Sequence, residues 1–316
     1  MVLFTEGLWA EKDGVSQLAT EPHPADPRHW HTRAGLGALW LVSRLPWSLQ
    51  RLIASVAGWL AFHFIRVRRR VVETNLRLCF PELSEHARQA IALAHYQSLA
   101  LGILEVARCW WRPPSDLPTH HIEGLDLLRK AAAGGKGVLL VSGHFTTLEI
   151  TGRMLTVAQS VSCLYRDPNN RVLAGLLRRH RSSWTQQAIE MNDLRGLVKA
   201  LRAGEIVWYA PDQAKRTAQS ELLPFRGIPC ITNTSTARLA EMTGAAVLTF
   251  YARRDDQGVY HLRISEGPAG IPSGDPTADT LRLVAELERA VEEAIPQYLW
   301  VHRRFKARPG MPDPYA

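Results

Sequence analysis

Short apolar runs alternate with amphipathic stretches from about residue 119 onward. The runs have the length of buried strands, and the stretches between them have the spacing of helices. Strands that alternate with helices indicate an α/β fold, so we predict a mixed, largely parallel central sheet flanked by helices. The expected strands are 137–143, 160–165, 205–210, 245–252 and 259–264, and the expected helices are 124–132, 147–157, 169–182, 193–203, 233–243 and 277–295.

Two local patterns refine this fold. The turn-like stretch 253–258 separates the last two strands and favours an antiparallel pair at that edge of the sheet. Upstream, Ser84 follows a proline and precedes a long apolar periodicity, which predicts a capped helix over 85–110.

The N-terminal part of the chain has a different pattern. It holds two apolar blocks, 34–42 and 52–65, which are nine and fourteen residues long. A membrane-spanning helix needs about 18–20 apolar residues, so neither block qualifies alone. The basic run 66–70 follows directly, and such a run suits an anionic membrane face. The blocks form either membrane-associated helices or a helical hairpin packed on the protein core.

These patterns divide the chain into three parts. Residues 1–32 are polar and predict a solvated extension, 33–70 predict membrane-associating helices with a basic flank, and 71–316 predict the α/β domain.

The formal net charge of +8 favours an anionic partner, which could be nucleic acid, an acidic membrane or a phosphorylated substrate. The chain contains no recognisable nucleic-acid reader motif, so we expect no nucleic-acid partner. Its four cysteines lie far apart, which argues against a disulfide scaffold and against a metal site.

His144 follows the first buried strand of the α/β part, and Glu149 follows five residues later. Positions five apart on a helix point in directions about 140° apart. The two side chains can therefore meet only if His144 lies in the turn before the helix, which Gly143 would help to form. A histidine held by a carboxylate is a general base with a fixed tautomer. Since the chain has no G-x-S-x-G elbow, that base would act on a substrate hydroxyl, or else His144 has only a structural role.

Polar residues follow two further strands. Arg166 and Asn170 come after 160–165, and Asp212 comes after 205–210. Three successive polar strand ends indicate one cleft, although each could also be ordinary turn chemistry.

The C-terminal run 300–308 is basic and aromatic, so Arg303 and Arg304 could bind phosphates or form a charged tail. Another basic cluster, residues 178–181, falls on an expected helix and predicts a solvated face.

Several stretches together resemble the late acyltransferases of lipid A biosynthesis, the lauroyl and myristoyl transferase family, from about residue 34 to residue 309. The matching stretches are NLRLCFPELSE (75–85), GHFTTLE (143–149), YR-x-x-x-N (165–170), GEIVWYAPDQ (204–213), TARLAEMTGAAV (236–247) and QYLWVHRRFKARP (297–309). The first and last are long and chemically arbitrary, which makes them far more specific than a bare H-x4-E spacing.

The resemblance implies a fold like that of the glycerol-phosphate acyltransferases, at the cytoplasmic face of the cell inner membrane. It implies transfer of a fatty acyl chain from acyl carrier protein to a hydroxyl of a 3-hydroxyacyl chain on a phosphorylated, Kdo-bearing lipid A precursor, without a cofactor. The family's catalytic pair falls on His144 and Glu149, and its Arg and Asp fall on Arg166 and Asp212.

One departure is that Ala214 stands where many members carry a second acid, and two basic residues follow it. The alternatives are an acyltransferase for another phospholipid or glycolipid acceptor, and a non-enzymatic basic protein that binds lipid or nucleic acid.

Overall fold

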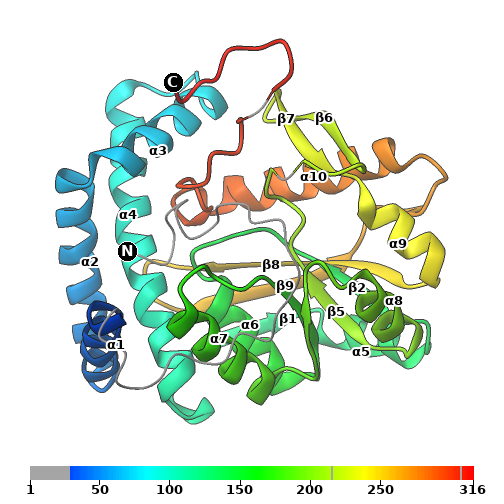
Figure 1. The fold of residues 1–316 in the computed structure, drawn as a ribbon, viewed down its shortest axis with the longest axis horizontal. Helices are drawn as coiled ribbons and strands as arrows, with labels where there is room; N and C mark the ends of the chain where they lie inside the picture. Colours follow the sequence, from blue (N-terminus) through cyan, green and yellow to red (C-terminus); the bar gives the residue numbers. More distant parts are fainter. Residues whose placement is uncertain (1–28, 215, 307) are drawn as a thin grey trace.

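The computed structural model describes residues 29–214, 216–306 and 308–316. In this part of the chain the main sheet has seven strands in the order β1-β9-β8-β2-β5-β3-β4 (Figure 1). All neighbouring strands are parallel except β8 and β9, so the predicted mixed, largely parallel sheet is confirmed. The strands are β1 (His120–Glu123), β2 (Val138–Val141), β3 (Ser162–Tyr165), β4 (Ala188–Glu190), β5 (Ile206–Tyr209), β8 (Ala246–Arg254) and β9 (Tyr260–Glu266).

Helices surround this sheet, as the sequence predicted. They are α1 (Trp30–Ser43), α2 (Trp47–Phe64), α3 (Arg66–Cys79), α4 (Glu85–Trp111), α5 (Leu125–Ala133), α6 (Leu148–Ala158), α7 (Arg171–Trp184), α8 (Leu194–Arg202), α9 (Ser235–Thr243) and α10 (Pro276–Glu293). Helix α4 begins as expected, because the Ser84 hydroxyl accepts a hydrogen bond from the N–H of Ala87 at 3.2 Å.

Four strands lie outside the predicted set. β1 is a polar four-residue strand and β4 has only three residues, so neither gives an apolar run. The other two, β6 (Ser220–Phe225) and β7 (Ile228–Asn233), form a separate antiparallel hairpin. Its two-residue turn, Arg226-Gly227, has φ values of 52° and 75°, which is the twist that tight hairpins require.

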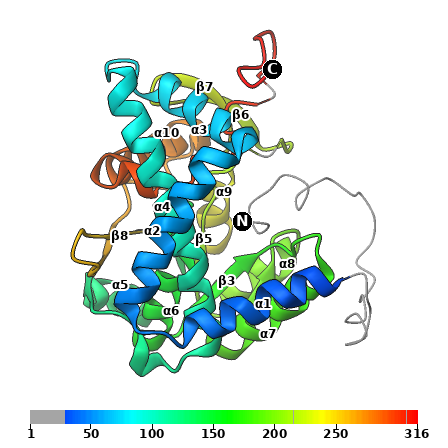
Figure 2. The same cartoon turned by 90° about the vertical axis from the view of Figure 1, so that its left-hand side faces the viewer.

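The helices α1, α2 and α3 form an outer layer over α4 (Figure 2). A Cβ at Gly58 would lie 2.4 Å from the Gln97 backbone, so a glycine is needed for α2 to approach α4 this closely. Residues 1–28 of the expected polar extension lie outside the described residues. The expected boundary at residue 70 falls inside α3.

One described helix, α4, is long and apolar enough to cross a membrane, but 56% of its apolar window is buried inside the protein. Helix α4 therefore has the burial of a core helix. The helices expected to associate with a membrane, α1 and α2, do not meet the length and hydropathy of a membrane span.

A buried polar network joins α4 to the sheet. Glu105 forms an ion pair with Arg254, and their side chains are 1% and 8% exposed. Arg254 also donates to the Ser98 hydroxyl at 3.0 Å, and Ser98 lies 2.7 Å from the Thr146 hydroxyl. These contacts join α4 to the segment that follows β2. They are costly to break, because removing one member of a buried ion pair leaves the other charge without compensation.

We expect Glu105→Ala to lower the free energy of unfolding by about 3–5 kcal/mol, because Arg254 would remain buried without its partner. Chemical denaturation followed by Trp fluorescence measures this loss. The control is Glu73→Ala, which breaks a surface pair with Arg69 whose side chains are 33% and 28% exposed and should cost less than about 1 kcal/mol. Equal losses in the two variants would contradict the prediction.

Candidate active site

His144 and Asp212 meet at the carboxyl ends of two adjacent parallel strands, β2 and β5. Asp212 Oδ2 accepts a hydrogen bond from the backbone N–H of His144 at 3.0 Å, and Oδ1 pairs with His144 Nδ1. The Asp212 side chain is 3% exposed, whereas that of His144 is 24% exposed. The Asp212 carboxylate is therefore buried behind the His144 imidazole, which lies between the carboxylate and the solvent.

The charge of Asp212 fixes the tautomer of His144. Burial alone would raise the pKa of Asp212, but its interactions with His144, which include hydrogen bonds from the ring and the backbone, and the charge of Arg304 hold it below its ordinary value of 3.8. An ionised carboxylate can only accept hydrogen bonds, so Nδ1 must carry the proton. Nε2 is then left with a free lone pair, which is what a general base needs.

Glu149 has a different partner from the one that the sequence predicted. It lies in the first turn of α6 and His144 lies in the turn before it, as expected. The Glu149 carboxylate accepts two hydrogen bonds from Arg181 of α7, at 2.7 and 3.3 Å. The two carboxylates therefore have separate partners: Asp212 holds the His144 ring, and Arg181 holds Glu149.

The turn that carries His144 is held by close backbone contacts. A Cβ at Gly143 would lie 2.5 Å from a methyl group of Leu287 of α10 and 3.6 Å from Asp212 Oδ2, so a larger residue there would require the Leu287 side chain to move. A Cβ at Gly102 would lie 2.5 Å from the Thr146 carbonyl oxygen. On the other side, the Leu299 N–H donates to the His144 carbonyl at 2.9 Å.

Arg166 and Asn170 follow β3, the neighbour of β5, so the three predicted strand ends do lie side by side. Arg166 is half-buried. Asn170 caps α7 by accepting hydrogen bonds from the N–H groups of Val172 and Leu173, at 3.1 and 3.2 Å, and donates to Thr32 of α1 at 2.9 Å. Its amide group thus makes structural contacts, and the predicted role of Asn170 in substrate binding stays a prediction.

The predicted phosphate ligands Arg303 and Arg304 have different surroundings. Arg303 is half-buried, with its guanidinium 5.6 Å from the centre of the Tyr315 ring. Arg304 is 3% exposed and lies over the Phe225 ring at 4.1 Å. Little of the Arg304 side chain is open to a substrate, and its predicted role in phosphate binding stays a prediction.

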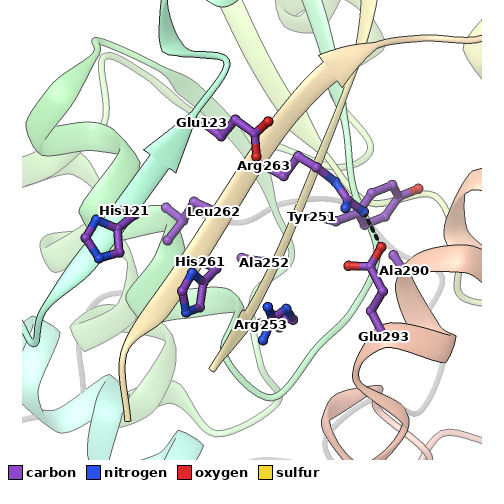
Figure 3. Close-up of a pocket in the computed structure, with 10 residues that line it drawn as sticks. All are labelled: His121, Glu123, Tyr251, Ala252, Arg253, His261, Leu262, Arg263, Ala290 and Glu293. Carbon is purple, nitrogen blue, oxygen red and sulfur yellow. Dashed lines mark hydrogen bonds and ion pairs between the residues drawn. The ribbon is translucent and has the colours of Figure 1, made fainter. Parts of the chain in front are cut away.

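A separate polar pocket lies on β1, β8 and β9 beside α10 (Figure 3). Within it Arg263 points toward Glu293 and donates a hydrogen bond at 2.7 Å. Tyr251 connects the pocket with the site, because its ring lies 6.3 Å from that of Phe145. The pocket lining does not include His144 or Asp212.

Comparison with known proteins identifies the family of this chain. The family described as bacterial lipid A biosynthesis acyltransferase matches residues 19–307. The lipid A biosynthesis palmitoleoyltransferase of Escherichia coli K12 is 35% identical over 286 residues, which cover 90% of this chain and 93% of the relative. The lauroyltransferase of the same strain is 34% identical over 296 residues, 92% of this chain and 96% of the relative. The chain belongs to the lipid A biosynthesis acyltransferase family.

The acyltransferase has its two most distinctive sequence stretches packed against each other. Asn75, from the NLRLCFPELSE stretch, donates hydrogen bonds to the carbonyls of Trp300 and His302 at 2.7 and 2.9 Å. Its amide oxygen accepts from the Tyr315 hydroxyl, and Phe80 packs edge-on against the Trp300 ring. The two stretches therefore form one layer behind His144.

Two residues of the acyltransferase site were missed by the sequence analysis. Tyr298 donates to Asp212 Oδ2 at 3.0 Å, although the sequence singled out only the basic residues near it. Arg181 was assigned to a solvated helix face, but its side chain is 17% exposed and binds Glu149. The helical spacing between Arg181 and the buried Leu173 and Ala174 was a weak signal for an inward position.

We expect Asp212→Asn to remove a pH-dependent part of the stability. Since the pKa of Asp212 is lowered in the folded state, its ionised form stabilises the fold above about pH 4, and this contribution is lost as the pH falls toward the folded value. The difference in unfolding free energy between the natural protein and Asp212→Asn should shrink below pH 3.8. Denaturation curves at several pH values measure it, with Asp126→Asn at a fully exposed side chain as the control. A difference that stays constant with pH would contradict the prediction.

Proposed function

We propose that this acyltransferase moves a fatty acyl chain from acyl carrier protein to a hydroxyl of a 3-hydroxyacyl chain on a phosphorylated, Kdo-bearing lipid A precursor. The observation that carries the proposal is the His144–Asp212 pair at adjacent strand ends, in a chain of this family. The relatives are named for palmitoleoyl and lauroyl transfer in lipid A biosynthesis, which supports both the lipid acceptor and a fatty acyl group.

The chemistry that we propose uses His144 as the general base. Nε2 removes the proton from the acceptor hydroxyl, and the oxygen attacks the thioester carbonyl carbon. When the tetrahedral intermediate collapses, the C–S bond breaks and the new ester C–O bond remains. The thiolate of the carrier then takes the proton from Nε2, so His144 ends neutral. Asp212 keeps the ring in the required tautomer and stabilises the imidazolium during the reaction.

In this proposal Glu149 lies near the general base but is not the partner of its ring. The Glu149 carboxylate forms a largely buried ion pair with Arg181 of α7, close to the turn that carries His144. The half-buried Arg166 and Arg303 remain the proposed ligands of the phosphorylated acceptor. The net charge of +8 suits both that acceptor and the membrane that contains it.

The proposed attachment to the cytoplasmic face of the inner membrane uses the outer layer of helices. Ten of the 17 large apolar side chains that are exposed in the described residues lie between Trp30 and Val67. They are Trp30, Trp40, Leu41, Leu49, Leu52, Val56, Trp59, Leu60, Phe64 and Val67. Helix α1 has 14 residues, which is fewer than a membrane span needs, and α2 has 18 residues but is not among the helices that are apolar enough for a span. The basic residues that follow at 66–70 suit anionic lipids.

The two carboxylates allow a sharp test of the base. We expect His144→Ala and Asp212→Asn each to lower kcat for acyl transfer by about 10²–10⁴-fold, because the base or its tautomer is lost. Glu149→Gln should have a smaller effect on kcat, because the contact between Asp212 and His144 Nδ1 remains. The measurement uses purified protein in detergent, lauroyl-carrier protein and a Kdo-bearing lipid A precursor.

Full turnover by His144→Ala would overturn the proposed base. Loss of turnover in Glu149→Gln together with an active Asp212→Asn would instead restore Glu149 as the partner of His144. Transfer to another lipid, with none to the lipid A precursor, would replace the acceptor.

The membrane contact has its own test. We expect the double variant Leu52→Glu, Phe64→Glu to bind vesicles containing anionic lipids at least about tenfold more weakly, because two charges would enter the lipid boundary. Cosedimentation with vesicles measures the binding. Met242→Glu is the matched control, since Met242 is also exposed, at 47%, but lies on α9. Equal binding by both variants would overturn the proposed attachment.

A further inference from the structure

The buried carboxylate of Asp212 presents an electrostatic problem. An ionised carboxylate inside a protein is costly unless hydrogen bonds and an opposite charge compensate it. Three hydrogen bonds are present, from the His144 backbone, His144 Nδ1 and the Tyr298 hydroxyl. If the imidazole alone supplied the opposite charge, it would have to hold a second proton, and a protonated imidazole cannot act as a base.

Arg304 supplies a permanent positive charge at the same place. Its side chain is 3% exposed and lies over the Phe225 ring, so it is shielded from water. That ring packs against the ring of Tyr298, with the two centres 5.7 Å apart, and Tyr298 donates to Asp212. The positive charge of Arg304 helps to lower the pKa of Asp212. Its Nε and one Nη have no hydrogen-bond partner among the described residues.

The backbone keeps this cation beside the base. Phe145 and Tyr298 form an antiparallel bridge, and the Leu299 N–H donates to the His144 carbonyl at 2.9 Å. Asn75 fixes the other side of the segment through the carbonyls of Trp300 and His302. The segment from Tyr298 to Arg304 is therefore attached directly to the turn that carries His144.

We propose that Arg304 is a positioning residue for the reaction, which acts through Tyr298 to hold Asp212 ionised and oriented while His144 stays neutral. The charges of Arg304 and Asp212 then cancel, and the imidazole can accept the substrate proton. The inference rests on the proposed role of His144 as the base. It assigns Arg304 to the support of that base, in place of a phosphate.

The titratable groups that face His144 and Asp212 from other elements do not gain or lose a proton between about pH 5 and pH 9. Burial and the neighbouring His144 lower the pKa of His302 to about 3. Burial raises the pKa of Tyr251, on β8, and that of Tyr298 well above the ordinary range. Burial raises the pKa of the Cys79 thiol, which lies near Arg304, to about 12. Cys230 of β7 also lies near Arg304.

The test is the pH dependence of kcat/KM for Arg304→Met between about pH 5 and pH 9. Without the cation, the imidazolium becomes the only charge that can balance Asp212. The acidic limb should therefore move upward by about one pH unit. The loss of kcat/KM should then be about tenfold greater near pH 6 than near pH 9. Arg304→Lys should keep the limb near its natural position.

Arg226→Met is the matched control. Arg226 also lies over an aromatic ring, that of Phe80 at 4.6 Å, and its side chain is 18% exposed, but its charge pairs with Glu292. Its loss should lower the melting temperature and leave the acidic limb in place. If Arg304→Met does not fold, Tyr298→Phe provides the second variant, since it removes the hydroxyl that donates to Asp212 and should also move the limb upward.

A loss of the same factor at every pH in Arg304→Met, or in Tyr298→Phe where the first variant does not fold, would overturn the inference and leave Arg304 a structural role. Unchanged kcat/KM at all pH values would overturn it as well. These outcomes differ from a failure of the proposed function, in which the natural protein transfers no acyl group or His144→Ala remains active.

Discussion

The hydrogen bonds between Asp212 and His144 are the contacts on which the site depends. They join two strand ends that are 68 residues apart in sequence, and they use both oxygens of one carboxylate. Because Oδ2 binds the backbone and Oδ1 binds the ring, the carboxylate fixes the turn and the imidazole together. Most of the other contacts in this region hold Asp212 or the turn in place.

The layer behind the pair comes from distant parts of the chain. Helix α3 contributes Asn75, the C-terminal segment contributes Tyr298 and Arg304, and the β6–β7 hairpin contributes Phe225. None of these side chains is well suited to a surface role, since each is buried. Packing behind the proposed base therefore explains much of the two most distinctive family stretches, and Arg303 is the residue within them that we propose contacts the acceptor.

The sequence predicted the sheet, the long helix α4 and the position of His144, because each depends on local patterns. Apolar runs mark the central strands, and Ser84 marks the start of α4. The partner of His144 depended on strand order, which no local pattern shows: β5 lies beside β2 only in the folded sheet. The five-residue spacing favoured Glu149 because it was the nearest carboxylate along the chain. Arg304 resembled a surface cation for a similar reason, since the ring that covers it, Phe225, is 79 residues away in sequence.

The close contacts along α4 fix the distance between α2 and the turn that carries His144. Gly58 lets α2 rest on the backbone of α4 at Gln97, and Gly102, slightly more than one turn further on, meets the carbonyl of Thr146 beside His144. Packed helices have axes about 8–10 Å apart, so α4 acts as a rigid spacer between the proposed lipid contact and the base. With the proposed base and the proposed membrane attachment, an acceptor hydroxyl would stand about one helix layer away from the surface on which α2 lies. This geometry would select lipids by how far the reactive group projects from the bilayer, separately from any recognition of the head group.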